Sequence, residues 1–177
     1  MSGKEFVTIF ADASFSPDTL RGGWGAAILY GNRTLETRYG PLRQCRDPLD
    51  AELRAIGNAL AAADQLGVLH GGPIVVMQSD CLGALGRVLG SHPDFRQVNN
   101  KKNKHRRDRR IVSLEPRERD RPVTDFIAHL VGTRGCQLFL KHVKGHLEGA
   151  SGRHNMNELA DKCATSGRLE AELLPSE

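Results

Sequence analysis

The alternation of hydrophobic and polar residues divides the N-terminal half of the chain into strands and a helix. Residues 6–11, 22–30 and 34–39 are short β-rich runs separated by turn residues, which predicts three strands in an antiparallel meander. From 49 to 66 hydrophobic residues recur every three or four positions, which predicts a helix. The continuous apolar run 74–77 is typical of a strand that is buried on both faces.

The C-terminal half alternates between helices and one more strand. The pattern predicts helices over 81–89, 123–130 and 155–169, and a strand over 138–143. Residues 92–121 break this pattern because they lack core periodicity and are rich in Asn, Lys and Arg. We expect them to form a protruding or partly disordered insertion, with only 111–114 apolar enough to fold back within it.

This order of elements predicts one α/β domain over residues 1–172 with a mixed sheet and helices on its faces, followed by a flexible tail over 173–177. Asp47 or Asp50 is expected to cap the helix that begins near residue 49. The glycines of the second strand indicate a bulge or a close approach by another backbone segment.

Composition narrows the class of protein. The 177 residues are 39% hydrophobic and 26% charged, which favours a soluble globular domain. No apolar run approaches the roughly 20 residues that a membrane span needs. The N-terminus lacks a basic and apolar leader, so we expect a cytoplasmic location. We also expect the protein to be a monomer. Four scattered cysteines without a CxxC pair favour free thiols over a zinc or redox site.

Charge is unevenly distributed along the chain. The formal net charge is +4, yet Arg96 to Arg121 holds eleven Lys and Arg against four Asp and Glu. A near-neutral body with one basic segment suggests a polyanionic partner such as a nucleic acid. A solvated, charge-rich loop explains the same composition equally well, and charge alone leaves both interpretations open.

Four acidic residues stand in positions from which they can converge. Asp12 and Asp80 each follow a hydrophobic strand, Glu52 lies in the first turn of a helix, and Asp161 lies in the last helix. Converging carboxylates repel one another unless hard cations such as Mg²⁺ or Mn²⁺ lie between them. Taken singly, each acid is more commonly a turn, cap or helix-dipole residue, and spacing alone does not select these four.

Five short stretches resemble type 1 ribonuclease H in order and context. They are 7–14 (VTIFADAS), 51–55 (AELRA), 78–81 (QSDC), 143–146 (VKGH) and 157–161 (NELAD). The similarity covers about residues 5–95 and 122–168. It implies a five-stranded mixed sheet with the first three strands antiparallel and helices on both faces. It also implies endonucleolytic hydrolysis of the RNA strand of RNA/DNA hybrids, leaving 5′-phosphate ends, with two Mg²⁺ or Mn²⁺ ions.

The resemblance assigns a role to each of the four acids. Asp12 would bridge both ions, Glu52 and Asp80 would hold the ion near the attacking water, and Asp161 would complete the coordination of the second ion. Phosphodiester hydrolysis suits such a pair of ions because they stabilise charge on both the attacking and the leaving oxygen.

The resemblance also suggests groups that assist turnover and hold the substrate. His146 resembles the family histidine that assists proton transfer or product release, and His154 in the same predicted loop is a lesser candidate. Some relatives carry a basic protrusion where this chain has its basic segment. The residues expected to contact phosphates there are Lys101, Lys102, Lys104, Arg106, Arg107, Arg109 and Arg110.

Two departures from the family pattern concern substrate recognition. The Asn pair that usually precedes the helix glutamate is replaced by the stretch 47–50 (DPLD), and Ala13 stands where a glycine is usual, so its methyl could crowd the scissile strand. Two alternatives therefore stay open: a nuclease of the same fold that acts on other structured RNA or DNA, and a non-catalytic nucleic-acid-binding module.

Overall fold

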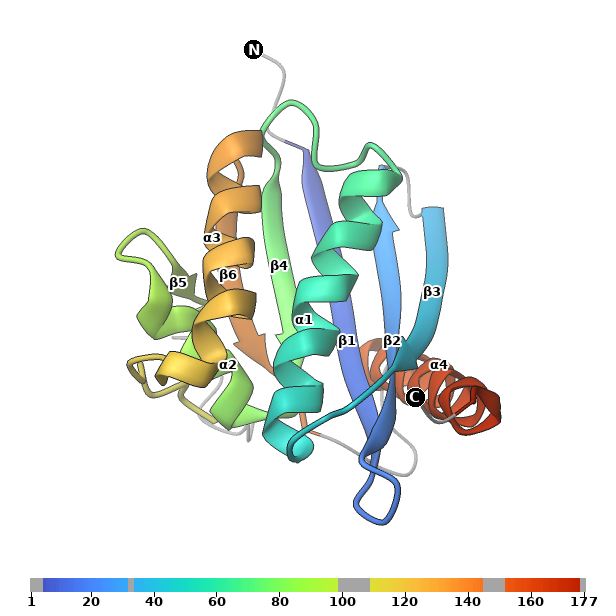
Figure 1. The fold of residues 1–177 in the computed structure, drawn as a ribbon. Coiled ribbons are helices and arrows are strands. Elements are labelled where there is room, and N and C mark those ends of the chain that lie inside the picture. The colour runs from blue at the N-terminus through green and yellow to red at the C-terminus, as the bar shows by residue number, and fades with distance from the viewer. Residues whose placement is uncertain (1–4, 32–33, 99–108, 145–151, 176–177) are drawn as a thin grey trace.

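The computed structural model describes residues 5–31, 34–98, 109–144 and 152–175, with side chains left out for 152–154. A six-stranded sheet runs through the molecule and carries helices on both faces (Figure 1). The elements in chain order are β1 (Phe6–Ser16), β2 (Arg21–Tyr30), β3 (Thr34–Leu42), α1 (Pro48–Gln65), β4 (Ile74–Ser79), α2 (Leu82–Ser91), β5 (Arg96–Gln97), a 3₁₀ turn η1 (Glu118–Asp120), α3 (Arg121–Arg134), β6 (Gln137–His142) and α4 (Gly152–Leu173).

The sheet is mixed, as the sequence predicts. Its strand order is β3-β2-β1-β4-β6-β5. The first three strands pair antiparallel, whereas β4, β5 and β6 join the sheet in parallel. The sheet has six strands rather than five, because Arg96 and Gln97 of the predicted insertion form a short strand that pairs with β6.

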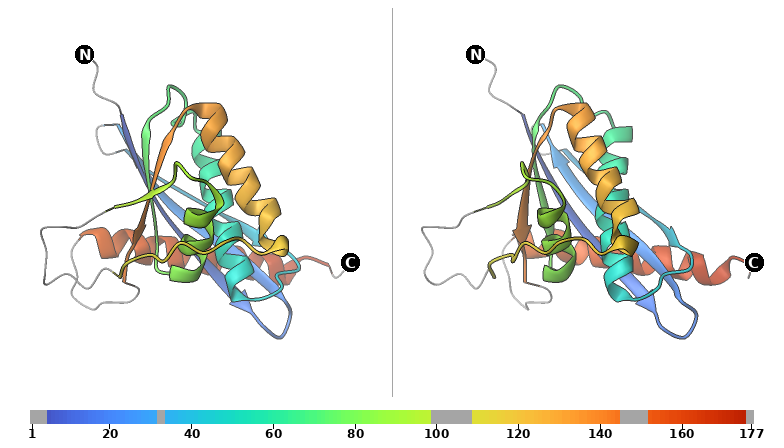
Figure 2. Two further views of the ribbon diagram at one scale, coloured as in Figure 1. Left: turned by 90° about the vertical axis from the view of Figure 1, so that its left-hand side faces the viewer. Right: turned by 60° about the vertical axis from the view of Figure 1, so that its left-hand side comes forward.

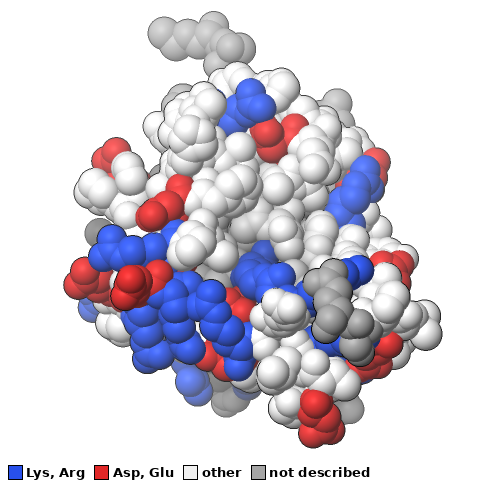
Figure 3. All heavy atoms as spheres, in the orientation of Figure 1, with Lys and Arg blue, Asp and Glu red and all other residues white. Residues whose placement is uncertain are grey.

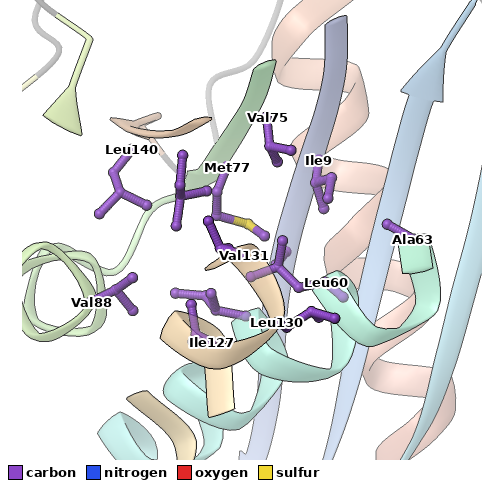
Figure 4. Packing of buried hydrophobic residues seen from close by; sticks show 14 of the residues in the cluster. Ile9, Leu60, Ala63, Val75, Met77, Val88, Ile127, Leu130, Val131 and Leu140 are labelled. Carbon is purple, nitrogen blue, oxygen red and sulfur yellow. The ribbon is translucent and has the colours of Figure 1, made fainter. Parts of the chain in front are cut away.

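The two faces of the sheet are covered differently. Helices α1, α2 and α3 lie on one face and α4 crosses the other, as the two further views show (Figure 2). The larger core lies on the α1 side, where Ile9, Leu60, Met77, Ile127 and Leu140 pack together (Figure 4). A smaller cluster of buried residues lies on the α4 side and consists of Phe10, Ala27, Val143 and Ala160.

Local sequence explains how α1 begins. Asp47 is the N-cap, and its carboxylate accepts a hydrogen bond of 2.8 Å from the backbone N–H of Asp50. Pro48 occupies the first turn, where no backbone N–H is needed and where its fixed φ favours the helix. Of the two candidate caps that the sequence offers, Asp47 is therefore the one used.

Two predicted boundaries are wrong in ways that matter for the site. Asp12 does not end its strand, because β1 continues to Ser16, which still pairs with Arg21 of β2. The last helix starts at Gly152 rather than near 155 and extends to Leu173. In both cases, pairing or helical geometry continues through residues whose polarity suggests a loop.

The ends of the predicted insertion pack on the core more closely than its composition suggests. Phe95 and Ile111 are buried, and the backbone N–H of Leu114 donates to the carbonyl of Gly86 in α2 at 3.0 Å. Residues 99–108 lie outside the described part of the chain. Across the described ranges, no helix combines the length and hydrophobicity that a membrane span requires.

Candidate functional site

Three of the four predicted acids meet at one end of the sheet. Asp12 of β1, Glu52 of α1 and Asp80, which follows β4, each place a carboxylate oxygen within 4.8 Å of the others. Asp12 is only 6% exposed, whereas Glu52 and Asp80 are half-buried. The structure thus brings together residues that are separated by up to 68 positions in the sequence.

Strand register explains why Asp12 and Asp80 are neighbours. Strands β1 and β4 are parallel, and their last pair is Phe10 with Gln78. Asp12 and Asp80 each lie two residues beyond that pair, so they lie at the same level where the pairing of β1 with β4 ends. Helix α1 packs on β1 and presents Glu52 from near its N-terminal end.

Burial and mutual repulsion make this cluster unfavourable for negative charge. Burial raises the pKa of Asp12 to about 7, and the charges of Asp80 and Asp161 add to the effect. Burial likewise raises the pKa of Glu52 to about 9, with further contributions from the charges of Asp12 and Asp80. A hydrogen bond between the two lowers the pKa of Asp12 and raises that of Glu52, so Glu52 is the group that holds the proton.

The donor set fits a hard divalent cation. Oε2 of Glu52 is buried and has no hydrogen-bond partner among the described residues. A buried oxygen acceptor without a donor is costly, and a cation between the carboxylates would satisfy it while relieving the repulsion. Carboxylate oxygens are the ligands that Mg²⁺ and Mn²⁺ prefer.

The residue after Asp12 orients its carboxylate. The backbone N–H of Ala13 donates to Oδ1 of Asp12 at 2.9 Å. The side chain of Ala13 packs against the cluster of Leu42, Cys45 and Ala51. The methyl group thus contributes to packing within the protein, and the expectation that it crowds the scissile strand stays a prediction.

Asp161 lies beside the cluster rather than inside it. It is half-buried on α4, and its charge contributes to the raised pKa of Asp12, which places the two carboxyls within electrostatic reach. Its oxygens do not belong to the group that converges within 4.8 Å. The four predicted acids therefore form a group of three with the fourth at its side.

The basic segment reaches the same end of the molecule. Arg109 is exposed, and its backbone N–H donates to Nδ1 of His142 at 3.3 Å. His142 ends β6 opposite Ser79, the residue before Asp80. Arg110 is also exposed. The other predicted phosphate-contacting residues lie outside the described residues: Lys101, Lys102, Lys104, Arg106 and Arg107.

The two candidate histidines are not placed. His146 lies outside the described residues, and His154 belongs to the first turn of α4, in the stretch without described side chains. His142, to which sequence analysis gives no role, anchors the backbone of the basic segment instead. The sequence alone does not single out His142, because its place beside Ser79 depends on the register between β4 and β6.

A second group of arginines surrounds the start of α1 and the start of α3. Nη2 of Arg119 lies 2.7 Å from Asp47, and Nη1 of Arg46 donates to the carbonyl of Arg119 at 3.0 Å. Arg87 and Arg119 both approach the buried carboxylate of Asp120, at 3.6 and 3.7 Å. Lys and Arg side chains gather over this lower part of the molecule in Figure 3. Arg119 belongs to the basic segment that the sequence shows, but the sequence does not predict that it lies beside Arg46 and Arg87.

Comparisons with known proteins agree with this architecture. The sequence model of the RNase H family matches residues 4–168. Comparison with curated protein sequences gives no match. RNase H1 from the halophilic archaeon Halobacterium salinarum NRC-1 is similar in structure, with 15% identity and a TM-score of 0.63 over 94% of this chain and 99% of that chain.

Two further solved structures are similar to the same extent. The N-terminal RNase H domain of a Mycobacterium tuberculosis protein, solved as a fusion with maltose-binding protein, has 14% identity and a TM-score of 0.64 over 95% of this chain and 96% of that chain. LC11-RNase H1, isolated from compost and solved in complex with an RNA/DNA hybrid, has 16% identity and a TM-score of 0.65 over 94% of this chain and 99% of that chain. At these identities the likeness is one of fold.

Proposed function

The chain belongs to the RNase H family, and from that premise we propose that it is an endonuclease that hydrolyses the RNA strand of RNA/DNA hybrids with Mg²⁺ or Mn²⁺. The observation that carries the proposal is the convergence of Asp12, Glu52 and Asp80 within 4.8 Å. The similar structure of LC11-RNase H1 with a hybrid supports this class of substrate. Family membership by itself supports the coarser conclusion of a nuclease.

The four carboxylates would together coordinate two metal ions. Asp12 would contribute to both, Glu52 and Asp80 to one, and Asp161 to the other. Two divalent ions, when bound, stabilise charge on the attacking and leaving oxygens of a phosphodiester. The protein itself holds these ligands in place before an ion binds. The N–H of Ala13 orients the Asp12 carboxylate, and the pairing of β1 with β4 sets the distance between Asp12 and Asp80.

We assign proton transfer and phosphate binding to two segments that flank the acidic residues in the sequence, namely the segment that contains His146 and the basic segment. His146 would assist proton transfer or product release. The basic residues of 101–110 would contact phosphates, and the contact of Arg109 with His142 ties this segment to the end of the sheet that carries Asp80. Phosphate contacts add affinity without sequence preference and make binding fall steeply with salt. The proposal includes a monomeric, cytoplasmic protein whose residues 1–172 form one domain.

A panel of labelled substrates tests the proposal. We expect cleavage of the RNA strand of a hybrid with Mg²⁺ or Mn²⁺, 5′-phosphate products, and no cleavage in EDTA. Asp80→Asn should abolish cleavage, whereas Asp125→Asn, which removes an exposed acid of α3, should leave it unchanged. Normal cleavage by Asp80→Asn would remove the site assignment, and hybrid binding without Mn²⁺-stimulated cleavage would favour a binding module.

A second candidate function keeps the nuclease and changes the substrate to other structured RNA or DNA. Where the family usually has an Asn pair, Asp47 caps α1 and pairs with Arg119, so its side chain is committed to contacts within the protein. The amide groups expected to recognise 2′-hydroxyls are therefore lacking at this place. Equal rates on hybrid, double-stranded RNA and single-stranded RNA would favour this alternative over hybrid specificity.

A further inference from the structure

At two glycines of β2, helix α4 approaches the sheet through its backbone, next to the side-chain cluster that contains Phe10 and Ala160. A Cβ atom built on Gly25 of β2 would be 2.1 Å from the carbonyl oxygen of Ala160 and 2.4 Å from the N of Ala164. One built on Gly23 would be 2.0 Å from the N of Arg168 and 2.2 Å from the carbonyl oxygen of Ala164. Any side chain at either glycine therefore requires the helix backbone to move.

Gly25 differs from Gly23 in what lies on its two sides. In the β1–β2 pairing Gly25 is directly opposite Asp12, whereas Gly23 is opposite Ser14. The helix residue nearest to Gly25 is Ala160, which immediately precedes Asp161. Gly25 is thus the cross-strand neighbour of one predicted metal ligand, Asp12, and faces the carbonyl oxygen of the residue before another, Asp161.

We infer that Gly25 is a positioning residue of the metal site, because its lack of a side chain sets the separation between Asp161 and the group of Asp12, Glu52 and Asp80. This inference rests on the proposed role of these carboxylates as metal ligands. It assigns no contact with substrate or metal to Gly25 itself. The effect is transmitted through the backbone of α4 at Ala160.

The displacement that a methyl group would cause is large on the scale of coordination chemistry. Real Cβ atoms essentially never approach another atom closer than 3.0 Å, so the 2.1 Å contact requires Ala160 to retreat by roughly 1 Å. Magnesium–oxygen distances are about 2.0–2.1 Å and tolerate little variation. Moving Asp161 by such an amount would weaken or abolish its share in binding an ion, while the other three carboxylates would stay in place.

Gly23 provides a matched control on the same strand and the same helix. Gly23→Ala creates an equally close clash, but with Ala164 and Arg168, which lie one to two turns beyond Asp161. Both variants should lower the melting temperature to a similar extent, since both add one methyl group to one backbone interface. Only Gly25→Ala should have a strong effect on metal affinity.

Calorimetric titration of the full chain with Mn²⁺ tests the inference, with melting temperature measured in parallel. We expect the wild type to bind two ions and Gly25→Ala to bind the weaker ion about 10-fold or more less tightly, in the range found when residues that orient ligands are lost. Gly23→Ala should change this affinity less than about threefold. In an Asp161→Ala background Gly25→Ala should have no further effect on Mn²⁺ affinity, because the two changes act through one carboxylate.

The outcomes separate the inference from the proposed function. If the wild type binds no Mn²⁺, the proposed function fails and the inference fails with it. Unchanged affinity in Gly25→Ala, an equal loss in Gly23→Ala, or additive losses in the Asp161→Ala background would each overturn the inference alone. Should Gly25→Ala not fold, Ala160→Ser adds a single oxygen atom to the fully buried side chain of the residue whose carbonyl oxygen faces Gly25, and it is expected to weaken binding of the same ion; normal Mn²⁺ affinity in that variant overturns the inference.

Discussion

On one face of the sheet α1 and α3 bury large side chains, among them Leu60 and Ile127, which interdigitate with Met77 of the sheet (Figure 4). On the opposite face α4 approaches Gly25 so closely that no side chain fits between them. Interfaces built from side chains can adjust by changing rotamers, whereas a backbone interface can only separate. Because Glu52 belongs to the first face and Asp161 to the second, the two carboxylates should respond differently to changes in packing.

The largest expected effect on stability lies on the α1 side. Leu60→Ala should lower the free energy of unfolding by about 2–5 kcal/mol, since Leu60 is fully buried and its truncation leaves a cavity. Leu169→Ala, at a half-exposed position of α4, is the matched control and should cost no more than about 0.5 kcal/mol. Urea denaturation measures both. A loss below 1 kcal/mol for Leu60→Ala would mean that this face is less tightly packed than the structure indicates.

The next effect separates the two carboxylates by activity. Glu52→Gln should reduce cleavage of a hybrid by about 100-fold or more, because Glu52 is inside the converging group and even residues that only orient ligands contribute about 10–100-fold. Asp161→Asn should cost less and recover partly at high Mn²⁺, since Asp161 lies beside the group. Initial rates across a range of Mn²⁺ concentrations measure the difference. A greater and irreversible loss in Asp161→Asn would reverse the ranking of the two faces.

A third effect appears in the pH dependence of the metal-free protein. The folded-state pKa values of about 7 for Asp12 and about 9 for Glu52 lie above the ordinary values of 3.8 and 4.5. Between these limits the folded state binds more protons than the unfolded state, so stability is highest at low pH and falls as pH rises toward 7 and 9. The slope is at most about 1.4 kcal/mol per pH unit for each carboxyl.

Melting temperatures in EDTA from pH 5 to 9 measure this slope. Asp12→Asn should flatten it and raise the stability of the metal-free protein at pH 8, because the repulsion within the cluster is reduced. Asp125→Asn, an exposed acid away from the cluster, should keep the wild-type slope. Stability that rises with pH over this range would contradict the burial of charge in the site.

The sequence predicted the α1 side of this comparison better than the α4 side. Helical spacing of Leu53, Ile56 and Leu60 and the apolar run of β4 depend on local patterns, and both elements are confirmed. The glycines of β2 predict a close backbone approach, yet nothing local indicates that the partner is a helix about 135 residues later in the chain. Such a contact depends on topology, which hydrophobic periodicity does not encode.

The candidate site shows the same limit. The position of Asp80 after an apolar run is a local signal, but Asp12 lies inside a strand that continues to Ser16 and is distinguished only by the register with β4. The short apolar run 111–114 predicts a segment that folds back, and the burial of Ile111 agrees with this, but the run does not indicate that α2 is the element against which Leu114 lies. Family resemblance supplied Glu52 and Asp161, whose places near the site follow from helix packing rather than from their own surroundings in the sequence.

The smallest expected effect on the free energy of unfolding comes from the N-terminal cap of α1 rather than from its buried face. Asp47→Ala removes the cap of α1 and should cost about 1 kcal/mol, with the first turn, which leads into Glu52, becoming less ordered. Asp47→Asn keeps an acceptor for the N–H of Asp50 and loses only the charge pairing with Arg119, which should cost at most about 0.5 kcal/mol because the pair is partly exposed. Urea denaturation distinguishes the two, and amide hydrogen exchange of residues 50–53 locates the change. Equal costs for both variants would show that the ion pair with Arg119, rather than the cap, stabilises the start of α1. The position of α1 on the sheet would then depend on the surrounding arginines as well as on its buried side chains.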